Sequence, residues 1–177
     1  MKKTTLYALT ETACLVALAV VLSWFKISTG GLGGSIDFVM IPLFVICYRR
    51  GFLYGIAGGL VFGFIKCLIG GGIGYGLVSI LLDYVLAYAA VGTAGFFKKP
   101  IAGTAVATGV RFLIHFISGV TIYAITASET VYGITTASPF IYSVVYNAPY
   151  VLVNGIVCAV IVVLLEKPMA KIPKSFK

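Results

Sequence analysis

One carboxylate, Asp83, lies deep within an apolar stretch of this sequence. It is about eight residues into the segment 76–97, or roughly 12 Å from its end at 1.5 Å per residue in a helix. A carboxylate near the centre of a membrane-spanning helix costs on the order of 3 kcal/mol, so Asp83 should face the interior of a bundle and meet a partner or a ligand. Tyr84 follows it directly. An acid beside tyrosine rings suits an organic cation, because aromatic faces attract positive charge and the carboxylate neutralises it.

A second group of polar side chains lies in the segment 137–154, which reads ASPFIYSVVYNAPYVLVN. Tyr142, Tyr146 and Asn147 are placed there among residues apolar enough to cross a membrane. Amide and phenol groups can hydrogen-bond the edge of a heterocycle. Pro149 follows Asn147 by two residues and removes a backbone donor, so we expect the helix to bend where the polar side chains are.

Arg111 and His115 form a third polar pair, in the segment 101–125. Their spacing of four residues places both side chains on one face of a helix, and Tyr123 continues that stripe. A single intramembrane histidine is often a packing residue, but two polar groups on one face with an aromatic above them indicate a lined cavity. An alternative stays open, in which Arg111 simply pairs with Asp83 as a structural bridge.

The elements that carry these residues are predicted from composition. The chain of 177 residues is 60% hydrophobic and 10% charged, with a mean hydropathy of +1.10, whereas an ordinary soluble domain is roughly a quarter charged. Apolar runs of about 20 residues are long enough to cross a bilayer as helices. We therefore expect a single membrane domain over 1–177, an all-α bundle of six transmembrane helices. The expected helices are 8–25, 36–48, 51–69, 76–97, 101–125 and 139–165, with a loop at 26–35.

The positions of lysine and arginine predict the orientation of this bundle. Ten of the thirteen lie near the two termini or in the links after the second and fourth helices: Lys2, Lys3, Arg49, Arg50, Lys98, Lys99, Lys167, Lys171, Lys174 and Lys177. Positively charged links stay on the cytoplasmic side, so both termini should be cytoplasmic. In that topology Asp83, His115, Tyr123 and Asn147 lie at comparable depth, which points to a pocket open to the outside.

Small residues mark two places where the chain could be approached or could move. Ala13 and Ala17 lie on one face of the first helix, where another helix can come close, either from this protein or from a partner. The glycine-rich loop 26–35 is either a mobile lid or a plain flexible turn. Gly55, Gly59 and Gly63 recur every four residues and predict tight helix contacts.

Enzyme chemistry is not indicated by the sequence. It contains no Ser-His-acid set, no His-Glu-x-x-His run, no aspartate pair typical of intramembrane proteolysis and no phosphate-binding Gly-x-x-x-x-Gly-Lys loop. The four cysteines form no Cys-x-x-Cys pair and are interpreted as small apolar residues, so no metal or cofactor is expected. Uphill movement of a ligand would need energy from another subunit or an ion gradient.

Four stretches in order resemble a known family. GGSIDFVMIP with YRRG, then LLDYVLAYAAVGTAG, RFLIHFISG and YSVVYN resemble the thiamine-specific substrate-binding subunit, or S component, of energy-coupling factor (ECF) transporters, the ThiT/YuaJ family. The resemblance spans nearly the whole chain. It implies a six-helix protein of a bacterial plasma membrane that captures thiamine from outside. It also implies docking on an energising module, made of a membrane coupling protein and two ATP-hydrolysing subunits.

The resemblance also implies roles for individual residues. Asp83 and Asn147 would hold the aminopyrimidine and the cationic ring, and Tyr123 falls near the aromatic residue that covers the thiazolium. With Tyr146, taken from the last helix, the expected ligand-binding residues are Asp83, Tyr84, Arg111, His115, Tyr123, Tyr142, Tyr146 and Asn147. Ala13 and Ala17 match the face that contacts the coupling protein. The chain departs from the family pattern at Val39, where an acidic residue is expected, and some members have Glu in place of Asp83.

Other functions remain compatible with the residues alone. An S component for another vitamin or for a thiamine precursor would use many of the same groups. A membrane scaffold, in which Asp83 pairs with Arg111 and the glycines only pack helices, predicts no ligand. An ion-coupled carrier acting alone predicts uptake without an ATPase partner, although no internal repeat supports it.

Overall fold

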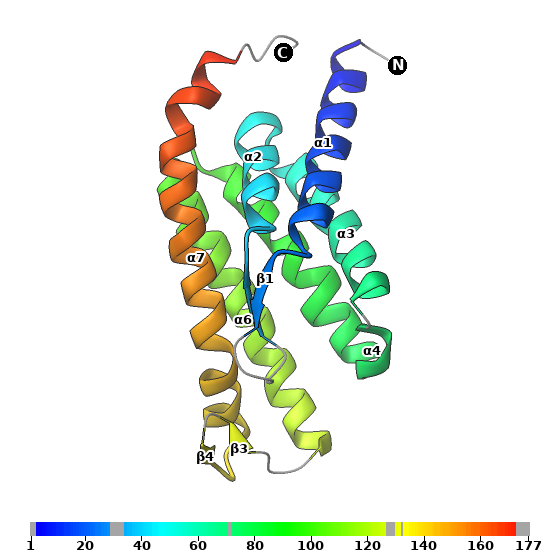
Figure 1. The fold of residues 1–177 in the computed structure, drawn as a ribbon, viewed down its shortest axis with the longest axis vertical. Coiled ribbons are helices and arrows are strands. Elements are labelled where there is room, and N and C mark those ends of the chain that lie inside the picture. The colour runs from blue at the N-terminus through cyan, green and yellow to red at the C-terminus, as the bar shows by residue number, and fades with distance from the viewer. Residues whose placement is uncertain (1–2, 29–33, 71, 127–129, 132, 173–177) are drawn as a thin grey trace.

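The computed structural model describes residues 3–28, 34–70, 72–126, 130–131 and 133–172. Its helices form one elongated bundle in which the first turn of α1 and the last turns of α7 lie at the same end, here called the terminal end (Figure 1). The continuous helices are α1 (Lys3–Leu22), α2 (Met40–Arg50), α3 (Phe52–Ile69), α6 (Pro100–Thr126) and α7 (Pro139–Lys171). The remaining helical rod, between α3 and α6, consists of η1 (Gly72–Tyr75), α4 (Gly76–Ser79), η2 (Ile80–Leu86), α5 (Ala87–Ala89) and η3 (Ala90–Phe96).

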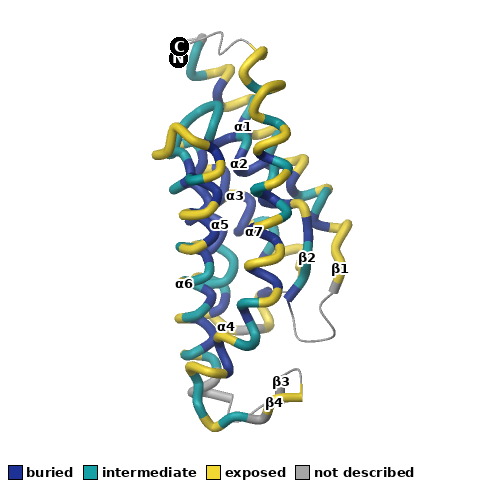
Figure 2. Tube along the Cα trace, turned by 90° about the vertical axis from the view of Figure 1, so that its left-hand side faces the viewer, coloured by how far each residue is buried: buried dark blue, intermediate teal, exposed yellow. Residues whose placement is uncertain are grey.

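The prediction of a helical membrane protein with six helices is confirmed, but only five of them are candidate membrane spans in the described part of the chain. These are Thr4–Leu22, Phe52–Ile69, Gly76–Phe96, Pro100–Ile122 and Pro139–Lys171. Large apolar side chains on their outer faces are exposed, and buried residues face the centre of the bundle (Figure 2). An apolar exterior of this kind matches a lipid environment.

The second predicted span, 36–48, is wrong in its extent. Residues Ser35–Asp37 form strand β2, and α2 begins only at Met40, so its 11 residues reach roughly 16 Å. That length is well short of the bilayer core. α2 ends at Gly51, whose φ of +85° is open to glycine but strained for other residues, and α3 starts at the next residue. This turn reverses the chain and returns it into the bundle.

The two ends of the predicted loop 26–35 form the strands of a short antiparallel hairpin. Strand β1 (Lys26–Ser28) pairs with β2, with Ile27 opposite Ile36. Residues 29–33 of this loop lie outside the described residues. A second hairpin, β3 (Thr130–Val131) with β4 (Ile134–Thr135), lies near the far end of the bundle, between α6 and α7.

The glycine row of α3 makes close helix contacts, as its spacing predicted. A Cβ on Gly59 would lie 2.2 Å from the Tyr88 carbonyl oxygen, and one on Gly63 would lie 2.4 Å from the Tyr84 carbonyl oxygen. α3 therefore packs backbone to backbone against the segment that carries Asp83. That segment, η2, is a π-helix of seven residues, a widened form that is rare and occurs frequently at functional sites.

Candidate functional site

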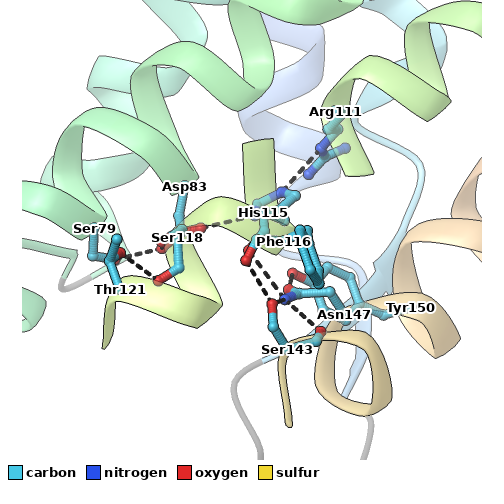
Figure 3. A network of polar contacts seen from close by, with 10 residues as sticks. All are labelled: Ser79, Asp83, Arg111, His115, Phe116, Ser118, Thr121, Ser143, Asn147 and Tyr150. Atoms are coloured by element: carbon cyan, nitrogen blue, oxygen red, sulfur yellow. Dashed lines mark hydrogen bonds and ion pairs between the residues drawn. The ribbon is translucent and has the colours of Figure 1, made fainter. Parts of the chain in front are cut away.

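Asp83 is the centre of a polar network between η2 and α6 (Figure 3). One carboxylate oxygen, Oδ2, accepts hydrogen bonds from Ser79 Oγ at 2.8 Å and from Ser118 Oγ at 2.7 Å. The other, Oδ1, lies 2.9 Å from His115 Nδ1. The side chain of Asp83 remains 23% exposed. The carboxylate is thus held by three donors and still reachable, as a residue that meets a ligand must be.

His115 links this carboxylate to Arg111. Arg111 Nε lies 3.3 Å from His115 Nε2, and an arginine can only donate, so Nε2 must be an acceptor. The proton of a neutral imidazole is then on Nδ1, from which it is donated to Asp83. Hydrogen-bond partners on both sides therefore fix one tautomer of a buried histidine.

Arg111 makes two further contacts besides the one to His115. Its guanidinium lies 4.4 Å from the centre of the Tyr88 ring, a cation–π contact, and Nη1 donates to Met40 Sδ. The structural bridge considered between Arg111 and Asp83 is not what the structure contains. In the described part of the chain, Asp83 is hydrogen-bonded to His115 at 2.9 Å, and Arg111 contacts the other ring nitrogen of His115 instead of the carboxylate.

Asn147 connects α7 to the network. Its Nδ2 lies 3.1 Å from the His115 carbonyl oxygen and 2.9 Å from the Ser143 carbonyl oxygen, and its Oδ1 accepts from Tyr150 Oη at 2.6 Å. The Tyr150 ring in turn meets His115 edge-on, with the ring centres 5.8 Å apart. A single amide therefore ties the histidine backbone to a tyrosine of the last helix.

Tyrosines spaced by four residues form an aromatic stripe along α7. The rings of Tyr142 and Tyr146 stack at 5.9 Å, and Tyr146 meets Tyr150 edge-on at 6.2 Å. Tyr142 and Tyr150 are buried and Tyr146 is half-buried. This stripe supplies π-faces next to the network, which is the surface that a flat cationic heterocycle can use. α7 is continuous through Pro149.

The structure brings together four of the predicted residues, Asp83, Arg111, His115 and Asn147, with Tyr142 and Tyr146 beside them. The remaining two predicted residues are Tyr84 and Tyr123. The Tyr84 ring lies against η1, where a Cβ on Gly72 would be 2.7 Å from it. The side chain of Tyr123 lies outside the described residues.

Several network residues were missed by the sequence analysis. Ser79 is four residues before Asp83, Ser118 is three after His115, and Ser143 is four before Asn147. Helical spacing from the named residues was a signal that could have found them.

Asn154 is the last residue of the segment 137–154, and the sequence analysis gave it no role. Its Oδ1 accepts from the Asp37 N–H at 2.9 Å, and its Nδ2 donates to the Ser35 carbonyl at 2.8 Å. Beside it, Gly34 touches Tyr150, since a Cβ there would lie 2.4 Å from that ring. The end of the hairpin is therefore fastened to the helix that carries Asn147.

No metal site accompanies this network. Among the residues that the structure describes, no cluster of three or more His, Cys, Asp or Glu side chains could hold an ion. The charged members are one carboxylate and one guanidinium, and a neutral His115 leaves their charges balanced. The arrangement can bind and orient a ligand through hydrogen bonds, charge and aromatic faces.

Comparison with known families identifies the family of the chain that forms this network. A family model described as thiamine transporter protein (Thia_YuaJ) matches residues 9–174. The chain belongs to this family. The thiamine transporter ThiT of Bacillus subtilis is 33% identical over 186 residues, covering 97% of this chain and 96% of that one. The resemblance drawn from the four sequence stretches is thereby confirmed.

A further relative and two solved structures match this chain over almost its whole length. ThiT of Lacticaseibacillus paracasei is 26% identical over 196 residues, covering 97% of this chain and 94% of that one. A solved structure of ThiT from Listeria monocytogenes matches with a TM-score of 0.79 at 25% identity, covering 97% of this chain and 98% of that one. A structure described as the S component of a bacterial ECF transporter matches with a TM-score of 0.69 at 23% identity, covering 94% and 96%. The fold is therefore shared over essentially the whole chain.

Proposed function

We propose that this protein is a thiamine-binding S component of an ECF-type importer, which captures thiamine from outside and delivers it with an ATP-driven module. Family membership supports the ligand and the transporter class. The observation that carries the proposal in this chain is Asp83, a partly exposed carboxylate held by three donors deep in an apolar bundle. Thiamine offers the matching chemistry, a permanent positive charge on one ring and an aminopyrimidine on the other.

The contacts of the network suggest how the ligand would be held. The carboxylate of Asp83 would accept from the ligand amine and balance the thiazolium charge, and the amide of Asn147 would bond the pyrimidine edge. The stacked rings of Tyr142 and Tyr146 would face the cationic ring. Because Ser79, Ser118 and His115 already occupy the carboxylate, ligand binding is an exchange of hydrogen bonds rather than the filling of a void.

Calorimetric titration of the purified full chain with thiamine tests the proposal. We expect saturable binding of one thiamine per chain. Asp83→Asn should weaken the affinity about 100-fold, since it removes a charge-assisted bond worth roughly 3 kcal/mol. The matched control is Glu166→Gln, an exposed carboxylate at the terminal end, which should bind like the parent.

Two results of this titration would reject the assignment. One is the absence of saturable binding. The other is an equal effect of the Asp83 and Glu166 substitutions. Tighter binding of an isolated pyrimidine or thiazole precursor than of thiamine would keep the site but replace the ligand.

The orientation and the partner are also part of the proposal. Arg49, Arg50, Lys98, Lys167 and Lys171 gather at the terminal end, which favours placing that end in the cytoplasm. Ala13 and Ala17 are both exposed on α1, so their small side chains leave room for a helix of a coupling protein. Ala13→Leu with Ala17→Leu should abolish co-purification with the energising module while keeping thiamine binding. Ala105→Leu, at an exposed alanine of α6, is the matched control, and equal loss of assembly in both would contradict the proposed face.

A further inference from the structure

A pocket of about 920 Å³ lies at the terminal end, remote from the network around Asp83 and sharing none of its residues. Its wall is formed by the start of α1, the end of α2, the end of η3 and the last turns of α7. The charged and helix-end residues in the wall are Arg49, Arg50, Gly51, Lys98, Pro100 and Glu166. Neither the family match nor the thiamine proposal uses this pocket.

Arg49 lines the pocket, and one of its side-chain donors lacks a described partner. Its side chain is only 9% exposed, and Nε donates to Glu11. Nη1 is buried and has no hydrogen-bond partner in the part of the chain that the structure describes. A buried guanidinium N–H favours an acceptor, and a phosphate oxygen is one that arginine binds well.

The charge of the pocket also favours an anion. Arg50 donates to the same Glu11 carboxylate as Arg49, so two guanidinium groups share one acid. Lys98 adds a third positive charge, and Glu166 is the only acidic residue in the wall. One positive charge therefore remains unbalanced when Glu11 and Glu166 are both ionised.

Two helix N-termini converge on the same space. Gly51 precedes the first turn of α3, and Pro100 is the first residue of α6, and both line the pocket. Neither helix has an acidic residue in its first turn. No acidic side chain in the first turn therefore offsets the positive end of either helix dipole, and the positive end of a helix favours phosphate groups.

We propose that this pocket binds the phosphate group of an anionic phospholipid. The source is a lipid headgroup because the pocket lies at one end of a membrane-spanning bundle, where headgroups are found. Apolar side chains in its wall, Phe97 and Ile172, are exposed and can lie along the first carbons of an acyl chain. Exposed Lys167 and Lys171 on α7 add a basic rim, and basic pockets between helices are known sites for such headgroups.

Native mass spectrometry of the delipidated full chain tests the site, with phosphatidylglycerol, zwitterionic phosphatidylcholine and inorganic phosphate as separate probes. We expect one phosphatidylglycerol to be retained at least tenfold more tightly than phosphatidylcholine. Arg49→Gln should reduce this preference at least fivefold. Lys98→Gln should also reduce the preference for phosphatidylglycerol. Because Lys98 is exposed and has no described partner, this variant should fold and remains informative if Arg49→Gln misfolds.

Lys99→Gln is the matched control, since Lys99 is equally exposed and next in the chain but is not part of the pocket wall. It should leave the preference unchanged. Equal effects of the Lys98 and Lys99 substitutions would overturn the proposal in favour of general surface charge. Equal retention of the two lipids, or inorganic phosphate binding as tightly as phosphatidylglycerol, would also overturn it. Thiamine titration is unaffected by any of these outcomes, so this proposal and the proposed function fail independently.

Discussion

Two buried arginines in this bundle differ in how completely they are paired. Arg111 donates to His115 and Met40 and lies over the ring of Tyr88, whereas Arg49 has one acid partner, shared with Arg50, and a buried Nη1 without a partner. In the described part of the chain, the buried side-chain atoms that lack a partner are Thr12 Oγ1, Arg49 Nη1 and Thr108 Oγ1, and none of them belongs to the Asp83 network.

The two regions therefore differ in how they would bind a ligand. In the Asp83 network no described buried side-chain nitrogen or oxygen lacks a partner. A ligand must therefore reproduce the bonds that it displaces, and this requirement gives selectivity. At the terminal-end pocket one arginine donor, Arg49 Nη1, has no partner in the described part of the chain, and the proposed phosphate would supply acceptors. The first region suits a specific small molecule and the second suits a common anion.

The largest effect is expected from Asn147→Leu. This change keeps the branching and the number of side-chain heavy atoms but leaves Tyr150 Oη and the His115 carbonyl without their buried partner. Each orphaned group costs about 1–3 kcal/mol, so the free energy of unfolding should fall by about 3 kcal/mol and thiamine binding should be lost. Denaturant unfolding followed by circular dichroism measures the first effect. A loss below 1 kcal/mol would mean that the network is not saturated as described.

Gly63→Ala should have an intermediate effect. The added methyl would sit 2.4 Å from the Tyr84 carbonyl oxygen, so α3 and η2 must separate, at about 2 kcal/mol. Because Asp83 is adjacent in η2, thiamine affinity should fall as well. Gly109→Ala is the matched control, since nothing lies within 4 Å of its added Cβ, and it should be neutral or slightly stabilising. Equal outcomes for the two variants would contradict the close packing of α3 on η2.

The smallest effect is expected from Arg49→Gln. The Glu11 carboxylate keeps Arg50, and the removed Nη1 had no partner, so the free energy of unfolding should change by no more than about 1 kcal/mol. The same unfolding experiment checks it. If Arg49→Gln lowered the free energy of unfolding as much as Asn147→Leu, Arg49 would be as firmly paired as the Asp83 network, and the comparison would be wrong.

Much of the fold followed from the sequence because its signals are local. Runs of apolar residues predicted the long helices, and the spacing of Gly55, Gly59 and Gly63 predicted their close contact. The short α2 was missed because 36–48 is apolar apart from Asp37. The residues before Met40 form β2 instead of helix, and β2 is hydrogen-bonded by Asn154, which is 117 residues away from Asp37. A partner so distant leaves no trace in local composition.

The sequence predicted which polar residues lie near one another but not which of them are bonded, and their role in ligand binding stays a prediction. The predicted topology placed Asp83, His115 and Asn147 at a comparable depth, and the structure places them in one network. Depth along a helix could be predicted because it depends only on the topology. Depth does not specify rotation about the helix axis, so Arg111 was considered as a partner for Asp83 although His115 occupies that place. The widened π-helix of η2 also alters the rotation of Tyr84 relative to an α-helix, and its ring lies against η1.

The chain contains one histidine, which allows a direct measurement at the centre of the network. Nitrogen NMR of protein labelled with ¹⁵N-histidine gives a single imidazole, so no assignment is needed. We predict a neutral ring protonated at Nδ1 before ligand is added, and a clear shift of its nitrogens when thiamine is added to saturation. A ring protonated at Nε2, or a spectrum that thiamine leaves unchanged while it binds, would contradict the placing of His115 between Asp83 and Arg111 in the thiamine site.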